Sequence, residues 1–135
     1  MRAHPSPTGL PPRVLLIEGC EDVRRVLLEI LTNEGYDVHG VSDGAEGIEQ
    51  CTHMPYDIVI ADLEAREDAG FETIRLLHER FPRTPILAVS ASDSPSLRTR
   101  AAESGAHQVF AKPFDIAGFL KAVRRSVPGE RASGQ

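Results

Sequence analysis

Five short apolar runs alternate along the chain with stretches in which apolar residues recur every three or four positions. The runs are RVLLI at 13–17, YDVHGV at 36–41, YDIVIA at 56–61, PILAV at 85–89 and QVFA at 108–111. Short apolar runs of this kind are typical of buried strands, and strands that alternate with helices predict a parallel sheet covered on both faces. Right-handed crossovers then favour a doubly wound α/β fold.

Helices are predicted between the runs. The first and last carry apolar stripes, Val23, Val26, Leu27, Ile30 and Leu31, and Ile116, Phe119, Leu120, Val123 and Val127. A middle helix is striped by Phe71, Ile74, Leu77 and Phe81. The first helix is expected to end at Asn33-Glu34-Gly35, and Ser42 or Asp43 to cap the second. The segment DSPSLRTRAAESG offers only Leu97 and a few alanines as an apolar face, so this helix should be loosely held.

Length and composition fit one folded domain. The chain has 135 residues, which is room for one ordinary core. The first dozen residues hold four prolines and little that can pack, and the last eight, PGERASGQ, are similar. We therefore expect a disordered tail at 1–12, a folded domain at 13–127 and a second disordered tail at 128–135.

Several classes of function are disfavoured by composition. The formal net charge is -5, which argues against direct binding to nucleic acid. No apolar stretch approaches the roughly 20 residues that span a bilayer, and no secretory signal is present, so a cytoplasmic protein without membrane contact is expected. The two cysteines, Cys20 and Cys51, are too few for a disulfide scaffold, and His53 beside Cys51 lacks a second ligand pair for zinc.

Polar residues stand where four of the predicted strands end. Glu18 follows the first, Asp62 the third, Ser90 the fourth and Lys112 the fifth. Ligands of such folds bind outside the carboxyl ends of the strands, at the point where strand order reverses. Because unpaired buried charge is costly, two acids and an amine should gather there only if they or a bound ion compensate one another.

Each of these residues also has a simpler interpretation. Asp62 could be an aspartate in the turn after a strand, Ser90 a common strand-end serine and Lys112 a solvated lysine. Arginine supplies 13 of the 15 basic residues, however, and Lys112 follows an apolar strand directly. A lysine is a compact charge that can reach one oxygen in a narrow site. The convergence of all four therefore favours a functional cluster.

Four segments now carry a family resemblance: VLLIE, YDIVIADL, PILAVSAS and GAHQVFAKPF. Their order and spacing over 13–127 resemble the receiver domain of bacterial two-component response regulators. The resemblance implies a flavodoxin-like fold with five parallel strands in the order 2-1-3-4-5 and five helices. It also implies a signalling module and not an enzyme.

The resemblance implies a role for each strand-end residue. Asp62 matches the aspartate that accepts a phosphoryl group from a histidine kinase, a phosphotransfer protein or a small phosphodonor. Ser90 and Lys112 match the hydroxyl and the amine that contact that group. Glu18 matches the first of two consecutive acids that hold Mg²⁺. Phosphoryl transfer is mainly positioning and charge neutralisation, which suits this set.

Two departures from the family pattern bear on these roles. Gly19 replaces the second acid, so Mg²⁺ affinity should fall by roughly tenfold to a thousandfold. Glu64, two residues after Asp62, is either a substitute metal ligand or a solvated loop acid. Val109 stands where the family often has an aromatic switch residue, and it has little rotamer freedom. Cys20 is either a packing residue or a redox group at the mouth of the site.

Three functions remain open at this point. The first is a single-domain receiver that is phosphorylated on Asp62 and signals through association with a downstream effector protein, unless the chain is part of a longer one. The second is a pseudo-receiver, a binding module that no longer uses phosphorylation, which Gly19 and Val109 favour. The third is an aspartate-dependent phosphatase with Glu64 as general acid, which the third-strand position of Asp62 and the short chain disfavour.

Overall fold

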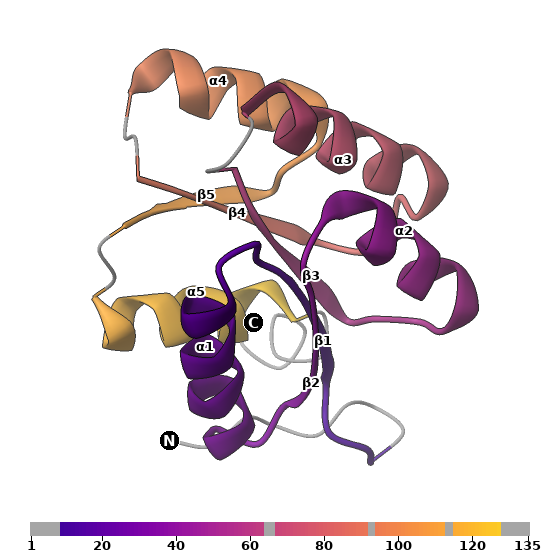
Figure 1. The fold of residues 1–135 in the computed structure, drawn as a ribbon, viewed down its shortest axis with the longest axis vertical. Helices are drawn as coiled ribbons and strands as arrows, with labels where there is room; N and C mark the ends of the chain where they lie inside the picture. The colour runs from indigo at the N-terminus through magenta and orange to yellow at the C-terminus, as the bar shows by residue number, and fades with distance from the viewer. Residues whose placement is uncertain (1–8, 64–66, 92–93, 113–114, 128–135) are drawn as a thin grey trace.

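The computed structural model describes residues 9–63, 67–91, 94–112 and 115–127, and these residues form alternating strands and helices (Figure 1). In chain order the elements are β1 (Arg13–Ile17), α1 (Glu21–Asn33), β2 (Asp37–Val41), α2 (Gly44–His53), β3 (Ile58–Asp62), α3 (Glu67–Arg80), β4 (Ile86–Ser90), α4 (Pro95–Ser104), β5 (Gln108–Ala111) and α5 (Ile116–Ser126). The expected tails lie outside these residues except for 9–12, of which Pro12 is buried and accepts a hydrogen bond from the Asp37 N–H.

The five strands form one parallel sheet in the order β2-β1-β3-β4-β5, which confirms the predicted flavodoxin-like fold. β2 and β5 are the edge strands. The chain runs outward from β1 to β2 and then returns past β1 to β3, so the strand order reverses between β1 and β3. The carboxyl ends of these two strands are therefore the place where a ligand site is expected.

Two apolar layers hold the helices on the sheet. Side chains alternate across a strand, so Leu15 and Ile17 face one layer while Val14 and Leu16 face the other. The first layer includes residues of α2, α3 and α4, and the second includes residues of α1 and α5. Figure 1 shows the two groups of helices on opposite faces of the sheet. Both faces of the central strands β1, β3 and β4 are covered, which is why these three strands have continuous apolar sequences.

The helix boundaries follow from local signals. α1 ends at Asn33, and Gly35 then takes a φ of 99°, a value that glycine adopts readily. Asp43 caps α2, because its carboxylate accepts a hydrogen bond of 2.9 Å from the Glu46 N–H. α3 ends at Arg80, shortly before Pro82, as predicted.

The apolar stripes of the outer helices are narrower than predicted. On α1 the buried residues are Leu27 and Leu31, whereas Val26 is 55% exposed. On α5, Ile116 is 41% exposed although it was expected on the buried face. Residues four apart in a helix share a face, so Leu27 and Leu31 form the centre of contact and Val26 lies on its flank. α4 buries only Leu97 and Ala101 within its span, as its weak stripe predicted.

Within the described ranges, no helix is long and apolar enough to cross a lipid bilayer.

Candidate functional site

The sheet brings the predicted strand-end residues to one edge. Asp62 is the last residue of β3 and pairs in register with Val89, one residue before Ser90. Ser90 ends β4 and pairs with Ala111, one residue before Lys112. Glu18 follows β1, the other neighbour of β3. Adjacent parallel strands thus deliver all four residues to the same end of the sheet.

Lys112 joins the two acids. Its ammonium nitrogen lies 3.3 Å from Oδ2 of Asp62 and 3.4 Å from Oε1 of Glu18. The Asp62 and Glu18 side chains are 9% and 4% exposed, and that of Lys112 is 19% exposed. The backbone N–H of Lys112 donates to the Ser90 carbonyl at 2.8 Å. This bond fixes the backbone of Lys112, and so the base of its side chain, beside the end of β4. The predicted convergence of carboxylates and amine is therefore present.

Both backbone polar groups and both carboxylate oxygens of Glu18 have hydrogen-bond partners. Its N–H donates to the Val41 carbonyl at 3.0 Å, and its own carbonyl accepts from the Arg24 guanidinium at 2.7 Å. Oε2 accepts from the Cys20 N–H at 3.1 Å, while Oε1 faces Lys112. A buried carboxylate is tolerated when its oxygens are paired in this way. The sequence predicted that Glu18 and Lys112 lie in one cluster, but the anchoring of Glu18 by Arg24 was not predicted, because it depends on side-chain reach in the folded chain.

The charges of the site affect the pKa of Lys112. Burial lowers the pKa of this amine, whereas the nearby carboxylates of Asp62 and Glu18 raise it. The net result is a pKa above the ordinary lysine value. Lys112 is therefore a stable positive charge at neutral pH.

Gly19 leaves an opening in this cluster. A Cβ built on Gly19 would have its nearest neighbour, the Ser42 carbonyl oxygen, at 3.6 Å, which is an ordinary contact. Packing therefore does not require glycine here. Within the part of the chain that the structure describes, no group of three or more His, Cys, Asp or Glu side chains could hold a metal ion. Glu64, which the sequence offers either as a substitute ligand or as a solvated loop acid, lies outside the described residues.

Three further residues that the sequence singled out are Cys20, Cys51 and Val109. Cys20 is exposed and precedes α1, and its side chain makes no capping hydrogen bond. Cys51 is buried, and burial raises the pKa of its thiol to about 11. Val109 is partly buried, and its carbonyl accepts a hydrogen bond of 3.4 Å from Arg98 on α4.

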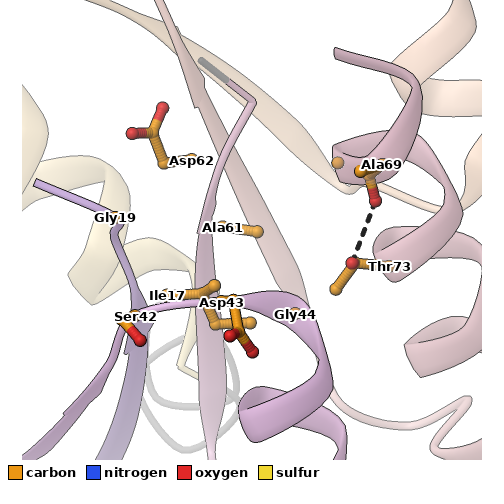
Figure 2. Close-up of a pocket in the computed structure, with 10 residues that line it drawn as sticks. Ile17, Gly19, Ser42, Asp43, Gly44, Ala61, Asp62, Ala69 and Thr73 are labelled. Atoms are coloured by element: carbon orange, nitrogen blue, oxygen red, sulfur yellow. Dashed lines mark hydrogen bonds between the residues drawn. The ribbon is translucent and has the colours of Figure 1, made fainter. Parts of the chain in front are cut away.

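A cavity of about 370 Å³ adjoins the cluster (Figure 2). It is bordered by Gly19 and Asp62 on one side and by the first turns of α2 and α3 on the other. Asp43, Gly44 and Thr73 also border it. Sequence reasoning missed this cavity, because its walls come from four separate segments whose spacing only the fold determines.

The sequence matches the family model of the response regulator receiver domain over residues 14–124. It is 30% identical over 114 residues to the uncharacterized transcriptional regulatory protein YkoG of Bacillus subtilis, a match that covers 84% of this chain and 50% of YkoG. It is 30% identical over 111 residues to the response regulator ArlR of Staphylococcus epidermidis, covering 82% of this chain and 50% of ArlR. The chain thus spans about half the length of the curated relatives it matches.

Solved structures show the same fold. The chemotaxis protein CheY4 of Vibrio cholerae superposes with a TM-score of 0.80 at 25% identity, covering 86% of this chain and 98% of that one. A CheY-like receiver domain protein of Methanospirillum hungatei superposes with a TM-score of 0.83 at 18% identity, covering 91% and 98%. Fold, strand-end cluster and family match agree, and the chain belongs to the receiver domain family of response regulators.

Proposed function

We propose that this receiver domain accepts a phosphoryl group on Asp62 from a histidine kinase or phosphotransfer protein. The observation that supports this most directly is the 3.3 Å contact between Lys112 Nζ and Asp62 Oδ2 at the switch point of the sheet. A carboxylate oxygen of Asp62 would form a bond to phosphorus while the bond from phosphorus to the donor's imidazole nitrogen breaks. Lys112 and the Ser90 hydroxyl would then contact the oxygens of the transferred group, where negative charge is greatest.

Mg²⁺ is the metal that this chemistry implies, and the chain offers only a partial site for it. Mg²⁺ in proteins is often held by one or two carboxylates and several waters, which Asp62 and Glu18 could supply. Glu64 would add a third if its side chain reaches the site. When bound, the ion neutralises charge on the transferred oxygens. Since Lys112 already pairs with both carboxylates and Gly19 provides none, we expect this metal to bind weakly.

The output of the domain is proposed to be association with a downstream effector protein. Added charge on Asp62 would draw Ser90 and Lys112 toward it and displace the neighbouring α4 and β5. α4 is suited to this because it buries only two of its residues, Leu97 and Ala101. A cytoplasmic location, without direct contact to nucleic acid or membrane, completes this proposal and agrees with the net charge of -5.

A second candidate is a receiver fold that binds its partner without phosphorylation. The double pairing of Lys112 and the missing carboxylate at Gly19 favour it, because both reduce the affinity for Mg²⁺. In this case Glu18, Asp62 and Lys112 would form a fixed structural cluster, with no change of state.

Intact-mass measurement after incubation with acetyl phosphate and Mg²⁺ distinguishes the two candidates. A single adduct of phosphoryl mass that is absent from Asp62→Ala supports phosphorylation of Asp62. Asp22→Asn is a matched control, since it removes an exposed carboxylate that pairs with the exposed Arg25, and it should be modified like wild type. Absence of the adduct would favour the phosphorylation-independent function, and its persistence in Asp62→Ala would contradict phosphorylation of Asp62.

A further inference from the structure

The connection from β1 to α1 carries one acid of the cluster but has few side chains that hold it in place (Figure 1). It consists of Glu18, Gly19 and Cys20. A Cβ on Gly19 would find its nearest neighbour among the described residues, the Ser42 carbonyl oxygen, at 3.6 Å. Cys20 is exposed, and its side chain does not cap α1. Because glycine also adds backbone freedom, the position of Glu18 depends on contacts from neighbouring elements.

Arg24, at the end of the first turn of α1, supplies such a contact. Its guanidinium donates to the Glu18 carbonyl at 2.7 Å, and its backbone N–H donates to the Cys20 carbonyl at 2.8 Å. The first bond is partly buried and has a charged donor, which makes it stronger than a bond between neutral groups. One residue thus binds both ends of the connection.

Gly40, on the edge strand β2, gives the Arg24 side chain room to reach Glu18. A Cβ on Gly40 would lie 3.2 Å from both Cγ and Cδ of Arg24 and 3.5 Å from Cδ1 of Leu28. The φ of Gly40 is not positive, so backbone conformation does not require glycine here. The next residue, Val41, accepts the Glu18 N–H at 3.0 Å. Adjacent residues of β2 therefore contact the arginine and the acid that it anchors.

The cluster is sensitive to the position of this backbone. Oε2 of Glu18 accepts from the Cys20 N–H at 3.1 Å, and Oε1 lies 3.4 Å from Nζ of Lys112. The second distance is longer than the usual range of hydrogen bonds, about 2.7 to 3.2 Å. A small displacement of the Glu18 backbone would therefore separate its carboxylate from Lys112.

We propose that Arg24 is a positioning residue of the site, which holds the Glu18 carboxylate beside Lys112 by fixing the Glu18 backbone. Gly40 serves the same purpose, because a side chain there would displace the arginine. The consequence for phosphorylation rests on the proposed function, in which a correctly placed Glu18 helps to hold Mg²⁺ next to Asp62. The positioning itself is measured on the unmodified chain.

Amide hydrogen exchange tests the positioning. Arg24→Met keeps an apolar stem over Gly40 and removes the donor, so the Cys20 amide, which is bonded to the Glu18 carboxylate, should exchange about tenfold faster. Arg24→Lys keeps a stem and a charged donor, and should stay within about threefold of wild type. Amides of the buried strand β4 report changes in global stability, so the rates are compared relative to them.

Arg25→Met is the matched control, because Arg25 is the exposed neighbour of Arg24 and pairs with Asp22. It should leave the exchange of the Cys20 amide unchanged. An unchanged rate in Arg24→Met, an equal acceleration in Arg25→Met, or a rate in Arg24→Lys as fast as in Arg24→Met would overturn the proposal.

A double substitution tests the part assigned to Gly40. Gly40→Val places two methyl groups where the Arg24 stem lies, and should accelerate exchange of the Cys20 amide by about fivefold. The same substitution in an Arg24→Ala chain, where no stem remains, should have no further effect. An equal effect in both backgrounds would show that Gly40 acts independently of Arg24 and would overturn this part.

Modification by acetyl phosphate separates the positioning from the proposed function. The Mg²⁺ concentration that gives half the maximal rate should rise by about fivefold in Arg24→Met and stay constant in Arg25→Met. Faster exchange at Cys20 with an unchanged Mg²⁺ requirement would overturn the link between Arg24 and the metal. A wild-type chain that gains no adduct would instead contradict phosphorylation of Asp62, and the exchange rates would still decide whether Arg24 positions Glu18.

Discussion

Lys112 and Glu18 are 94 residues apart in the chain, and their charged groups lie 3.4 Å apart in the fold. In this receiver domain the acid that follows β1 thus contacts the same lysine as Asp62. One lysine charge offsets one of the two carboxylate charges, and the neighbouring Gly19 adds no further negative charge. The resting cluster therefore keeps a single net negative charge that Lys112 alone does not neutralise.

Glu18→Gln should destabilise the fold by about 2 kcal/mol, because it removes a charged hydrogen bond between groups that are mostly buried. Urea unfolding at pH 7 measures this. Asp22→Asn removes an ion pair with Arg25 whose side chains are 88% and 66% exposed, and should change the free energy of unfolding by less than about 0.5 kcal/mol. Equal effects of the two substitutions would show that the contact between Glu18 and Lys112 contributes no more than a surface pair.

The raised pKa of Lys112 predicts a loss of stability in alkali. An amine whose pKa is higher in the folded than in the unfolded chain stabilises the fold below its unfolded pKa, about 10.4. That contribution is lost as the pH rises through the folded pKa. The difference in free energy of unfolding between wild type and Lys112→Met should therefore be constant from pH 8 to about pH 10 and shrink above it. A difference that grows with pH would contradict the direction of the shift.

The sequence predicted the sheet well because each buried strand is an unbroken apolar run, and it predicted the site because parallel strands share one edge. The sequence was a poorer guide to side-chain burial and to individual contacts, because these depend on residues that are far apart in the chain. Val26 belongs to the apolar stripe of α1 by spacing, yet it is exposed because the sheet covers only the centre of that stripe. Glu18 was expected in the cluster with Lys112 and as a metal ligand, but its direct contact with Lys112, across the ends of β3 and β4, leaves no signal of its own in the sequence. The cavity beside Asp62 could not be predicted either, because its walls come from segments that only the fold brings together.

The two cysteines should differ strongly in reactivity. Burial raises the pKa of Cys51 to about 11, so only about one in a thousand of these thiols is ionised at pH 8, whereas Cys20 is exposed. Ellman's reagent should therefore titrate one thiol per chain rapidly and the second only after unfolding in urea. Cys20→Ser should abolish the rapid phase. Rapid reaction of two thiols in the folded wild type would show that the region around Cys51 opens easily.

Hydrogen exchange should be faster in α4 than in α5. Within its span α4 buries Leu97 and Ala101, whereas α5 buries Phe119, Ala122, Val123 and Ser126. α4 is also held by Arg100, whose guanidinium carbon lies 4.3 Å from the centre of the Phe71 ring. Arg100→Ala should lower the protection of α4 amides by about threefold, from a cation–π contact of about 0.6 kcal/mol, and leave α5 unchanged. Equal protection of both helices would argue against α4 as the mobile element of the domain.

Gly19→Asp should raise the affinity for Mg²⁺ by roughly tenfold to a thousandfold, because it returns a second carboxylate to the loop after β1. The backbone accepts this side chain, since the nearest atom to its Cβ among the described residues would be the Ser42 carbonyl oxygen at 3.6 Å. Isothermal titration of Mg²⁺ into wild type and variant gives the ratio directly. Cys20→Asp adds the same charge one residue later, at an exposed position before α1, and should raise the affinity by less than about threefold. Equal gains in the two variants would mean that general negative charge, and not a ligand at position 19, limits metal binding.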